Sequence, residues 1–175
     1  GGFSYGDYLR SGAIARFAAI MEDVKKFANN GGKVIGICNG FQILLEAGLL
    51  PGAMKRNDTL HFISKYHTLK VINNDNTFLS LMKKDEVVNI PVAHHDGNYY
   101  IDEKGLKELE ANGQILLKYC DKNGTPVSMN GSVANIAGIC NKEKNVFGLM
   151  PHPERAIEDL LGSTDGVNML KGFLQ

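Results

Sequence analysis

One cysteine stands where its thiol could act as a nucleophile. Cys38 lies in the middle of Gly36-Ile37-Cys38-Asn39-Gly40, which has the form of a nucleophile elbow with cysteine in place of serine. Small neighbours avoid clashes at such a strained strand-to-helix turn. The helix N-terminus favours the thiolate, and the backbone N–H of Asn39 is expected to point toward a developing oxyanion. A lone cysteine after a strand is more often part of a core, but the flanking glycines favour the nucleophile.

A second run of residues could supply a general base. His152 lies between two prolines and is followed by Glu154. Each proline fixes its own φ and restricts the residue before it, so we expect His152 to be held rigidly, as a general base should be. Side chains two residues apart in an extended segment project to the same side, and a carboxylate beside an imidazole stabilises its protonated form. A surface histidine in a proline-rich loop would explain this run equally well by itself, but the elbow favours catalysis.

The segments around the elbow predict the elements that position it. Residues 33–37 form a short apolar run bounded by glycine, which is typical of a buried strand in a parallel sheet. Apolar residues at 41–45 predict a short helix that ends near Gly48. Residues 14–28 have the periodicity of an amphipathic helix, which Asn and Gly at 29–32 would end. A strand, a sharp turn and a helix in succession indicate an α/β fold.

The remainder of the chain is expected to be rich in strands. Polar connections typical of hairpins separate several apolar segments. No internal repeat or linker divides the sequence, so we predict one domain spanning 1–175. The expected strands are 62–72, 87–93, 115–119, 132–139 and 145–150, with helices at 105–111 and from about 166 to the end.

The composition excludes several classes of protein. The chain has 19 basic and 19 acidic residues, and this balance argues against a nucleic-acid or anionic-membrane partner. No apolar run is long enough to cross a bilayer, and no secretory signal is visible. Three sparse cysteines suggest reduced thiols in the cytoplasm. A metal site at His94 and His95 is not expected, because adjacent side chains on a strand point to opposite faces.

The sequence resembles the class I glutamine amidotransferases, and more narrowly the glutaminase subunits of phosphoribosylformylglycinamidine synthase in purine biosynthesis. The resemblance covers essentially the whole chain and implies a flavodoxin-like α/β fold, with a mostly parallel sheet flanked by helices. The motifs that carry it are Gly1-Gly2-Phe3-Ser4-Tyr5-Gly6-Asp7-Tyr8-Leu9-Arg10, Gly12-Ala13-Ile14-Ala15, Gly36-Ile37-Cys38-Asn39-Gly40-Phe41-Gln42, Pro91-Val92-Ala93-His94, Asn130-Gly131-Ser132, Ile136-Ala137-Gly138-Ile139 and Gly148-Leu149-Met150-Pro151-His152-Pro153-Glu154-Arg155.

The resemblance also implies a role for each candidate site residue. Glutamine would be hydrolysed to glutamate and ammonia through a thioester on the nucleophile. The catalytic residues would be Cys38 as nucleophile, His152 as proton carrier and Glu154 as the residue that orients His152. The oxyanion and substrate-binding groups would be the backbone amides of Gly2, Phe3 and Asn39, with the side chains of Gln42 and His94.

The ammonia would be consumed by a partner. The resemblance implies a synthetase subunit that uses ATP and Mg, together with a small accessory subunit. The chain itself has no phosphate-binding loop, so no cofactor is expected in it. The expected location is the cytoplasm.

Two departures from the family pattern are visible. The first strands and first helix of the family precede the opening loop, so we expect an N-terminally incomplete domain with exposed apolar surface. Asp96 and Asn98 stand where the family has Glu and Arg, which questions a substrate or partner contact at that loop.

Two alternative functions stay open. One is a Cys-dependent hydrolase of the DJ-1 or peptidase type, against which Gln42 and Glu154 argue. The other is an inactive glutaminase-like interaction subunit. The presence of all three residues of the Cys–His–Glu set argues against this second alternative. The expected absence of the N-terminal part leaves it open.

Overall fold

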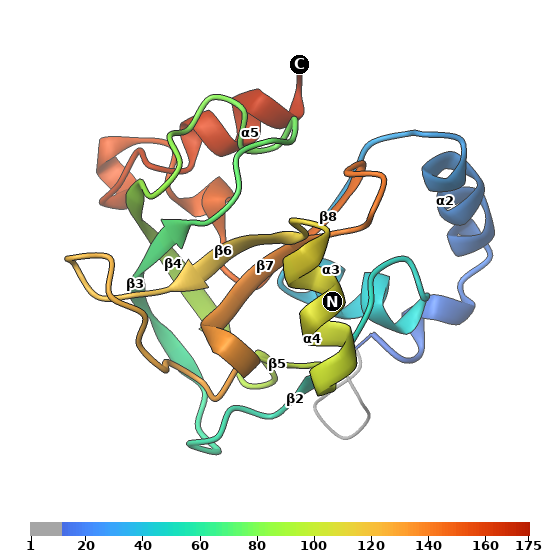
Figure 1. The fold of residues 1–175 in the computed structure, drawn as a ribbon, viewed down its shortest axis with the longest axis horizontal. Helices are drawn as coiled ribbons and strands as arrows, with labels where there is room; N and C mark the ends of the chain where they lie inside the picture. The colour runs from blue at the N-terminus through green and yellow to red at the C-terminus, as the bar shows by residue number, and fades with distance from the viewer. Residues whose placement is uncertain (1–11) are drawn as a thin grey trace.

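The fold is built on a six-stranded sheet with the order β1-β8-β7-β6-β3-β4 (Figure 1). The computed structural model describes residues 12–175. A separate two-stranded sheet pairs β2 (Ala53–Lys55) with β5 (Asn98–Tyr100). The strands of the main sheet are β1 (Val34–Ile37), β3 (Ile63–Val71), β4 (Val87–His94), β6 (Ile115–Tyr119), β7 (Ile136–Cys140) and β8 (Val146–Leu149). The helices are η1 (Ala15–Phe17), α2 (Ile20–Asn29), α3 (Asn39–Glu46), α4 (Glu103–Ala111), η2 (Val133–Asn135), η3 (Pro153–Arg155), η4 (Asp159–Leu161) and α5 (Val167–Phe173).

Helices cover both faces of the main sheet, as predicted. Leu44 of α3 and Leu109 of α4 belong to the same buried cluster as Val146. Met169 of α5 belongs to a second buried cluster with Phe147. Val146 and Phe147 are consecutive in β8, so their side chains point to opposite faces of the sheet. The two clusters are therefore the two hydrophobic cores of an α/β fold.

The sheet contains fewer parallel pairings than expected. Within residues 12–175, β1 and β8 run parallel, while the pairings β8–β7, β7–β6, β6–β3 and β3–β4 are antiparallel. A short polar connection joins β7 to β8, and such a connection permits only an antiparallel pair. The parallel pair instead joins strands that are far apart in the sequence. Its register sets Gly36 opposite Gly148 and Ile37 opposite Leu149.

The sheet is curled, which brings its two ends together. β1 and β4 are the opposite edge strands. Nevertheless, the backbone N–H of His152, just after β8, donates to the carbonyl of Pro91 in β4 at 2.8 Å. The end of β4 therefore lies beside the end of β8. The backbone N–H of Cys38, just after β1, donates to the carbonyl of Leu149 in β8, so the ends of β1, β4 and β8 meet at one edge of the sheet.

The predicted helix over residues 14–28 is divided into η1 and α2. Met21 and Ala28 of α2 are buried. In contrast, Phe17, Ile20 and Phe27 are 75%, 63% and 56% exposed, so much of the apolar face of this segment is open. Figure 1 shows α2 at the periphery of the fold. Within residues 12–175, no helix combines the length and apolar character needed to cross a membrane.

Candidate functional site

The predicted elbow forms between β1 and α3. Cys38 has φ 50° and ψ −105°, a conformation that costs a non-glycine residue about 1–3 kcal/mol. Its backbone N–H donates to the carbonyl of Leu149 in β8 at 2.8 Å, which ties the turn to the parallel pair. The helix α3 starts at Asn39, directly after the cysteine. The thiol is thus carried on a strained turn at a helix N-terminus.

Two facing glycines allow α3 to approach the sheet. A Cβ on Gly36 would lie 2.6 Å from the carbonyl carbon of Gly40, and a Cβ on Gly148 would lie 2.2 Å from the ring of Phe41. Both distances are far below van der Waals contact. A Cβ on Gly40 would meet no atom of the described residues within 4 Å. Within residues 12–175, the steric need for a small residue beside Cys38 is therefore seen at Gly36.

His152 lies at the same edge of the sheet as Cys38 because β8 runs parallel to β1. Its Nδ1 is 2.6 Å from Oε1 of Glu154. The sequence predicted an extended segment here, whereas Pro153–Arg155 forms the single turn η3. The expected contact between imidazole and carboxylate is nevertheless present.

The electrostatics of this pair favour a charged imidazole. Burial by itself would lower the pKa of His152, but the interactions with Cys38 and Glu154 outweigh burial and raise it to about 9. For Glu154, burial acts to raise the pKa, but the hydrogen bond from His152 prevails and the pKa is lowered. Nε2 of His152 is buried and makes no hydrogen bond within residues 12–175. The Cys38 thiol donates instead to the carbonyl of Ala93 at 3.6 Å.

The raised pKa of His152 predicts a pH-dependent stability. Its ordinary value is 6.5. A proton held more tightly in the folded state stabilises fully below pH 6.5, and this stabilisation is lost as the pH rises through about 9. Glu154→Gln removes part of the attraction, so the variant should lose less stability over this window than the wild type. Urea unfolding at a series of pH values measures this, and parallel curves would contradict it.

Gln42 supports the site through both ends of its side chain. Its Nε2 donates to the carbonyl of Asp96 at 2.7 Å, and its Oε1 accepts from the side chain of Asn39 at 2.9 Å. The residue is buried. Its amide therefore holds the turn after β4 against α3, and the contact with glutamine that the family resemblance implies stays a prediction.

His94, at the end of β4, is buried beside the candidate catalytic residues. Only 3% of the residue is exposed. Burial, and then the positive charge of His152, lower the pKa of His94 to about 4, so the ring is neutral near pH 7. The predicted oxyanion residues Gly2 and Phe3 lie outside the described residues, as does most of the opening loop motif.

A buried polar cluster that the sequence did not reveal surrounds the turn that follows His94. Asn57 accepts from the backbone N–H of Gly97 at 3.1 Å, and Asn130 donates to the carbonyl of Gly97 at 2.6 Å. Asn57 and Asn130 are fully buried. The motif Asn130-Gly131-Ser132 is one of those on which the family resemblance rests, but the sequence assigned no function to it. The residues around Asn57 form no motif that would distinguish it from an ordinary loop residue. In the same turn, Oδ1 of Asp96 lies 3.0 Å from Nδ1 of His95.

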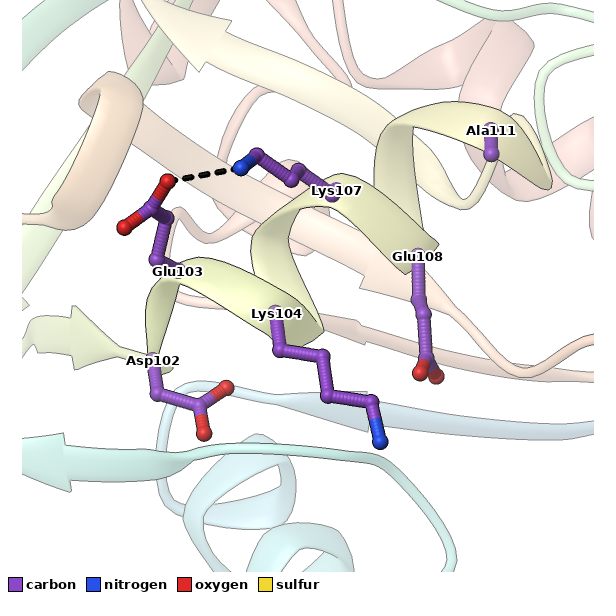
Figure 2. Close-up of a pocket in the computed structure, with 6 residues that line it drawn as sticks. All are labelled: Asp102, Glu103, Lys104, Lys107, Glu108 and Ala111. Carbon is purple, nitrogen blue, oxygen red and sulfur yellow. Dashed lines mark hydrogen bonds and ion pairs between the residues drawn. The ribbon is translucent and has the colours of Figure 1, made fainter.

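A depression of about 650 Å³ lies on the surface of α4 (Figure 2). Its lining residues come from one helix and its N-cap, and they include none of the predicted site residues. Figure 2 shows the ion pair between Glu103 and Lys107, at 2.6 Å, on this exposed face. The depression is therefore a solvated helix surface. Among residues 12–175, no group of three or more His, Cys, Asp or Glu side chains could hold a metal ion.

Comparison with known proteins gives close relatives along the whole chain. It is 70% identical over 175 residues to the phosphoribosylformylglycinamidine synthase subunit PurQ of Sulfurimonas denitrificans, covering 100% of this chain and 78% of the relative. The subunit of the same name from Campylobacter jejuni is 59% identical, with coverages of 99% and 75%.

Solved structures agree with this relationship. The structure of PurLQS from Thermotoga maritima matches with a TM-score of 0.87 and 44% identity, covering 99% of this chain and 76% of that one. A glutamine amidotransferase from the same organism matches with a TM-score of 0.60 at 12% identity, covering 97% of this chain and 74% of that one, which shows the fold alone. These matches confirm the predicted flavodoxin-like α/β fold.

The family model described as the CobB/CobQ-like glutamine amidotransferase domain matches residues 1–166. This match covers nearly the whole chain, and it agrees with the relatives and with the elbow and histidine described above. The chain therefore belongs to the CobB/CobQ-like glutamine amidotransferase family, in the branch of the PurQ subunits of phosphoribosylformylglycinamidine synthase.

Proposed function

We propose that this chain hydrolyses glutamine to glutamate and ammonia with Cys38, His152 and Glu154, and supplies the ammonia to a phosphoribosylformylglycinamidine-forming synthetase. One observation carries the proposal for the chemistry. The parallel pairing of β1 with β8 sets the elbow thiol and His152 at one edge of the sheet, with Glu154 2.6 Å from the imidazole. Family membership and the names of the relatives support the choice of substrate and pathway.

The first half of the reaction forms a thioester. The Cys38 thiolate, paired with the His152 imidazolium, attacks the carboxamide carbon of glutamine. The backbone N–H of Asn39 and the N-terminus of α3 stabilise the oxyanion. The C–N bond then breaks, and His152 gives its proton to the leaving nitrogen. Ammonia departs, and the glutamyl group stays on the sulfur. The resemblance adds the backbone amides of Gly2 and Phe3 to this oxyanion hole.

The second half releases glutamate. His152, now neutral, takes a proton from a water molecule that attacks the thioester carbonyl. The C–S bond breaks, and the thiolate–imidazolium pair is restored. Glu154 contributes throughout, because its contact with Nδ1 leaves Nε2 as the atom that exchanges protons.

The proposed partners follow from the relatives. The Thermotoga maritima structure is that of PurLQS, and we infer that this chain likewise works with a synthetase subunit and a small accessory subunit. ATP and Mg act in the synthetase, and this chain works without a cofactor. Its cysteines are free, in keeping with a cytoplasmic location.

Alkylation of Cys38 tests the proposal against a different Cys-dependent hydrolase. Iodoacetamide should label Cys38 first, because Cys120 and Cys140 are buried and burial raises the pKa of both thiols. Glutamine should slow this labelling, and glutamate or asparagine should do so much less. Peptide mass spectrometry reads each cysteine separately. Labelling of Cys38 at the same rate with and without saturating glutamine would count against a glutamine site.

A further inference from the structure

Asn57 holds the turn that joins β4 to β5. It lies in the loop between β2 and β3, and it is fully buried. Its backbone N–H donates to the carbonyl of His95 at 2.9 Å, and its Nδ2 donates to the carbonyl of His94 at 3.0 Å. Its Oδ1 accepts from the backbone N–H of Gly97 at 3.1 Å. Asn57 therefore makes hydrogen bonds to the backbone of three of the four residues in the turn 94–97.

A second asparagine completes the support of this turn. Asn130 is also fully buried, and its Nδ2 donates to the carbonyl of Gly97 at 2.6 Å. A Cβ on Gly97 would lie 2.2 Å from the ring of His94, so the turn is closely packed as well. Buried backbone groups that lose their partners are costly. The turn therefore has one well-defined position while both asparagines are in place.

The turn is joined to the elbow through two side chains. The carbonyl of Asp96 accepts from Nε2 of Gln42 at 2.7 Å, and Oε1 of Gln42 accepts from the side chain of Asn39 at 2.9 Å. Gln42 is buried, and Asn39 directly follows Cys38 as the first residue of α3. A displacement of the turn would therefore displace the residue whose backbone N–H is assigned to the oxyanion in the proposed reaction.

We propose that Asn57 is a positioning residue for glutamine hydrolysis, which fixes the backbone amide of Asn39 through the turn 94–97 and Gln42. The inference rests on the proposed glutaminase function. Donors to a developing oxyanion act best when they are fixed before the reaction, and a misplacement of about 1 Å can cost about 100-fold in rate. Cys38 itself is held separately, by its backbone hydrogen bond to β8. Loss of the Asn57 side chain should therefore impair the oxyanion hole and leave the thiol in place.

Asn57→Ser tests this role, because it removes Nδ2 and Oδ1 and keeps the backbone contact with the turn. We expect kcat for glutamate release, measured with the synthetase, to fall at least about tenfold, with KM within about threefold of the wild-type value. Alkylation of Cys38 by iodoacetamide needs the thiolate but no oxyanion hole, so its rate should stay within about twofold. An unchanged kcat, a loss confined to KM, or a parallel loss of kcat and alkylation would overturn the proposal.

Asn145→Ser is the matched control. Asn145 is another buried asparagine, and its Nδ2 donates to the carbonyls of Ala28 and Gly32, both at 2.8 Å. It lies just before β8, at the opposite end of that strand from His152. Its substitution removes hydrogen bonds of the same kind, so stability should fall, but kcat should stay within about twofold of the wild-type value. An equal loss of kcat in both variants would show a general effect of stability and would overturn the proposal.

A double-mutant cycle tests the route from Asn57 to the elbow. In a Gln42→Met background the link to α3 is already broken, so Asn57→Ser should lower kcat by less than about threefold. Asn57→Asp, which keeps the size of the side chain but loses its donors to carbonyl groups when ionised, takes its place if the serine variant does not fold. Equal losses in both backgrounds, with an active wild type, would refute this inference alone. A wild-type chain that releases no glutamate with its synthetase would refute the proposed function, and this inference with it.

Discussion

Replacing Cys38 by alanine is expected to lower glutamate release from glutamine by at least about 10⁴-fold, because no other group can form the thioester. The loss should appear in kcat, since the side chain acts on the reacting carbon. The measurement is glutamate production by the chain with its synthetase. Synthesis with added ammonium salt in place of glutamine should remain unchanged, because that route bypasses this chain.

Cys140→Ala is the matched control for this substitution. Cys140 is a free thiol like Cys38, but it lies buried in β7, where burial raises its pKa to about 11. Its loss should leave glutamate release near the wild-type rate. Retention of more than a few per cent of activity in Cys38→Ala, or an equal loss in Cys140→Ala, would refute the nucleophile assignment.

The second large effect concerns stability. Gly36→Ala is expected to destabilise the fold by about 2–4 kcal/mol, because the added methyl would lie 2.6 Å from the Gly40 carbonyl carbon and α3 would have to move away from β1. The displacement would also move the elbow, so glutamate release should fall with stability. Urea unfolding followed by circular dichroism gives the free energy of unfolding.

Gly40→Ala is the control for Gly36→Ala. The same methyl group at residue 40 meets nothing among the described residues within 4 Å, and residue 40 lies in α3, where alanine is the better helix former. Its free energy of unfolding should be equal to that of the wild type or slightly higher. A similar loss in both variants would show that the close approach of α3 to β1 is not the cause.

Structural features that depend on a few consecutive residues could be predicted from the sequence. The elbow around Cys38 depends on its neighbours in the chain, and the rigidity of His152 depends on the two prolines beside it. His152 and Glu154 are separated by only one residue, and their contact forms even though the segment is a turn. Local rules were sufficient for these features because the physical cause is local.

Features that depend on distant pairing could not be predicted. Nothing in residues 34–37 or 146–149 specifies that these strands pair with each other. The curl that brings Pro91 to His152 depends on the whole sheet. Asn57 acquires its role only because β4 and the loop before β3 come together around its amide. The two hydrogen bonds of the Gln42 side chain likewise join α3 to the turn after β4, which is distant in the sequence.

The convergence of three chain segments at the site has a consequence for folding. Helices and hairpins can form early because their contacts are local, whereas the pairing of β1 with β8 must close a long loop of chain. A molecule with all its local structure but without this pairing has a cysteine and a histidine that do not meet. Under the proposed function, catalytic activity therefore reports the long-range pairing of β1 with β8, and molecules that lack this pairing are inactive even when their helical content is complete.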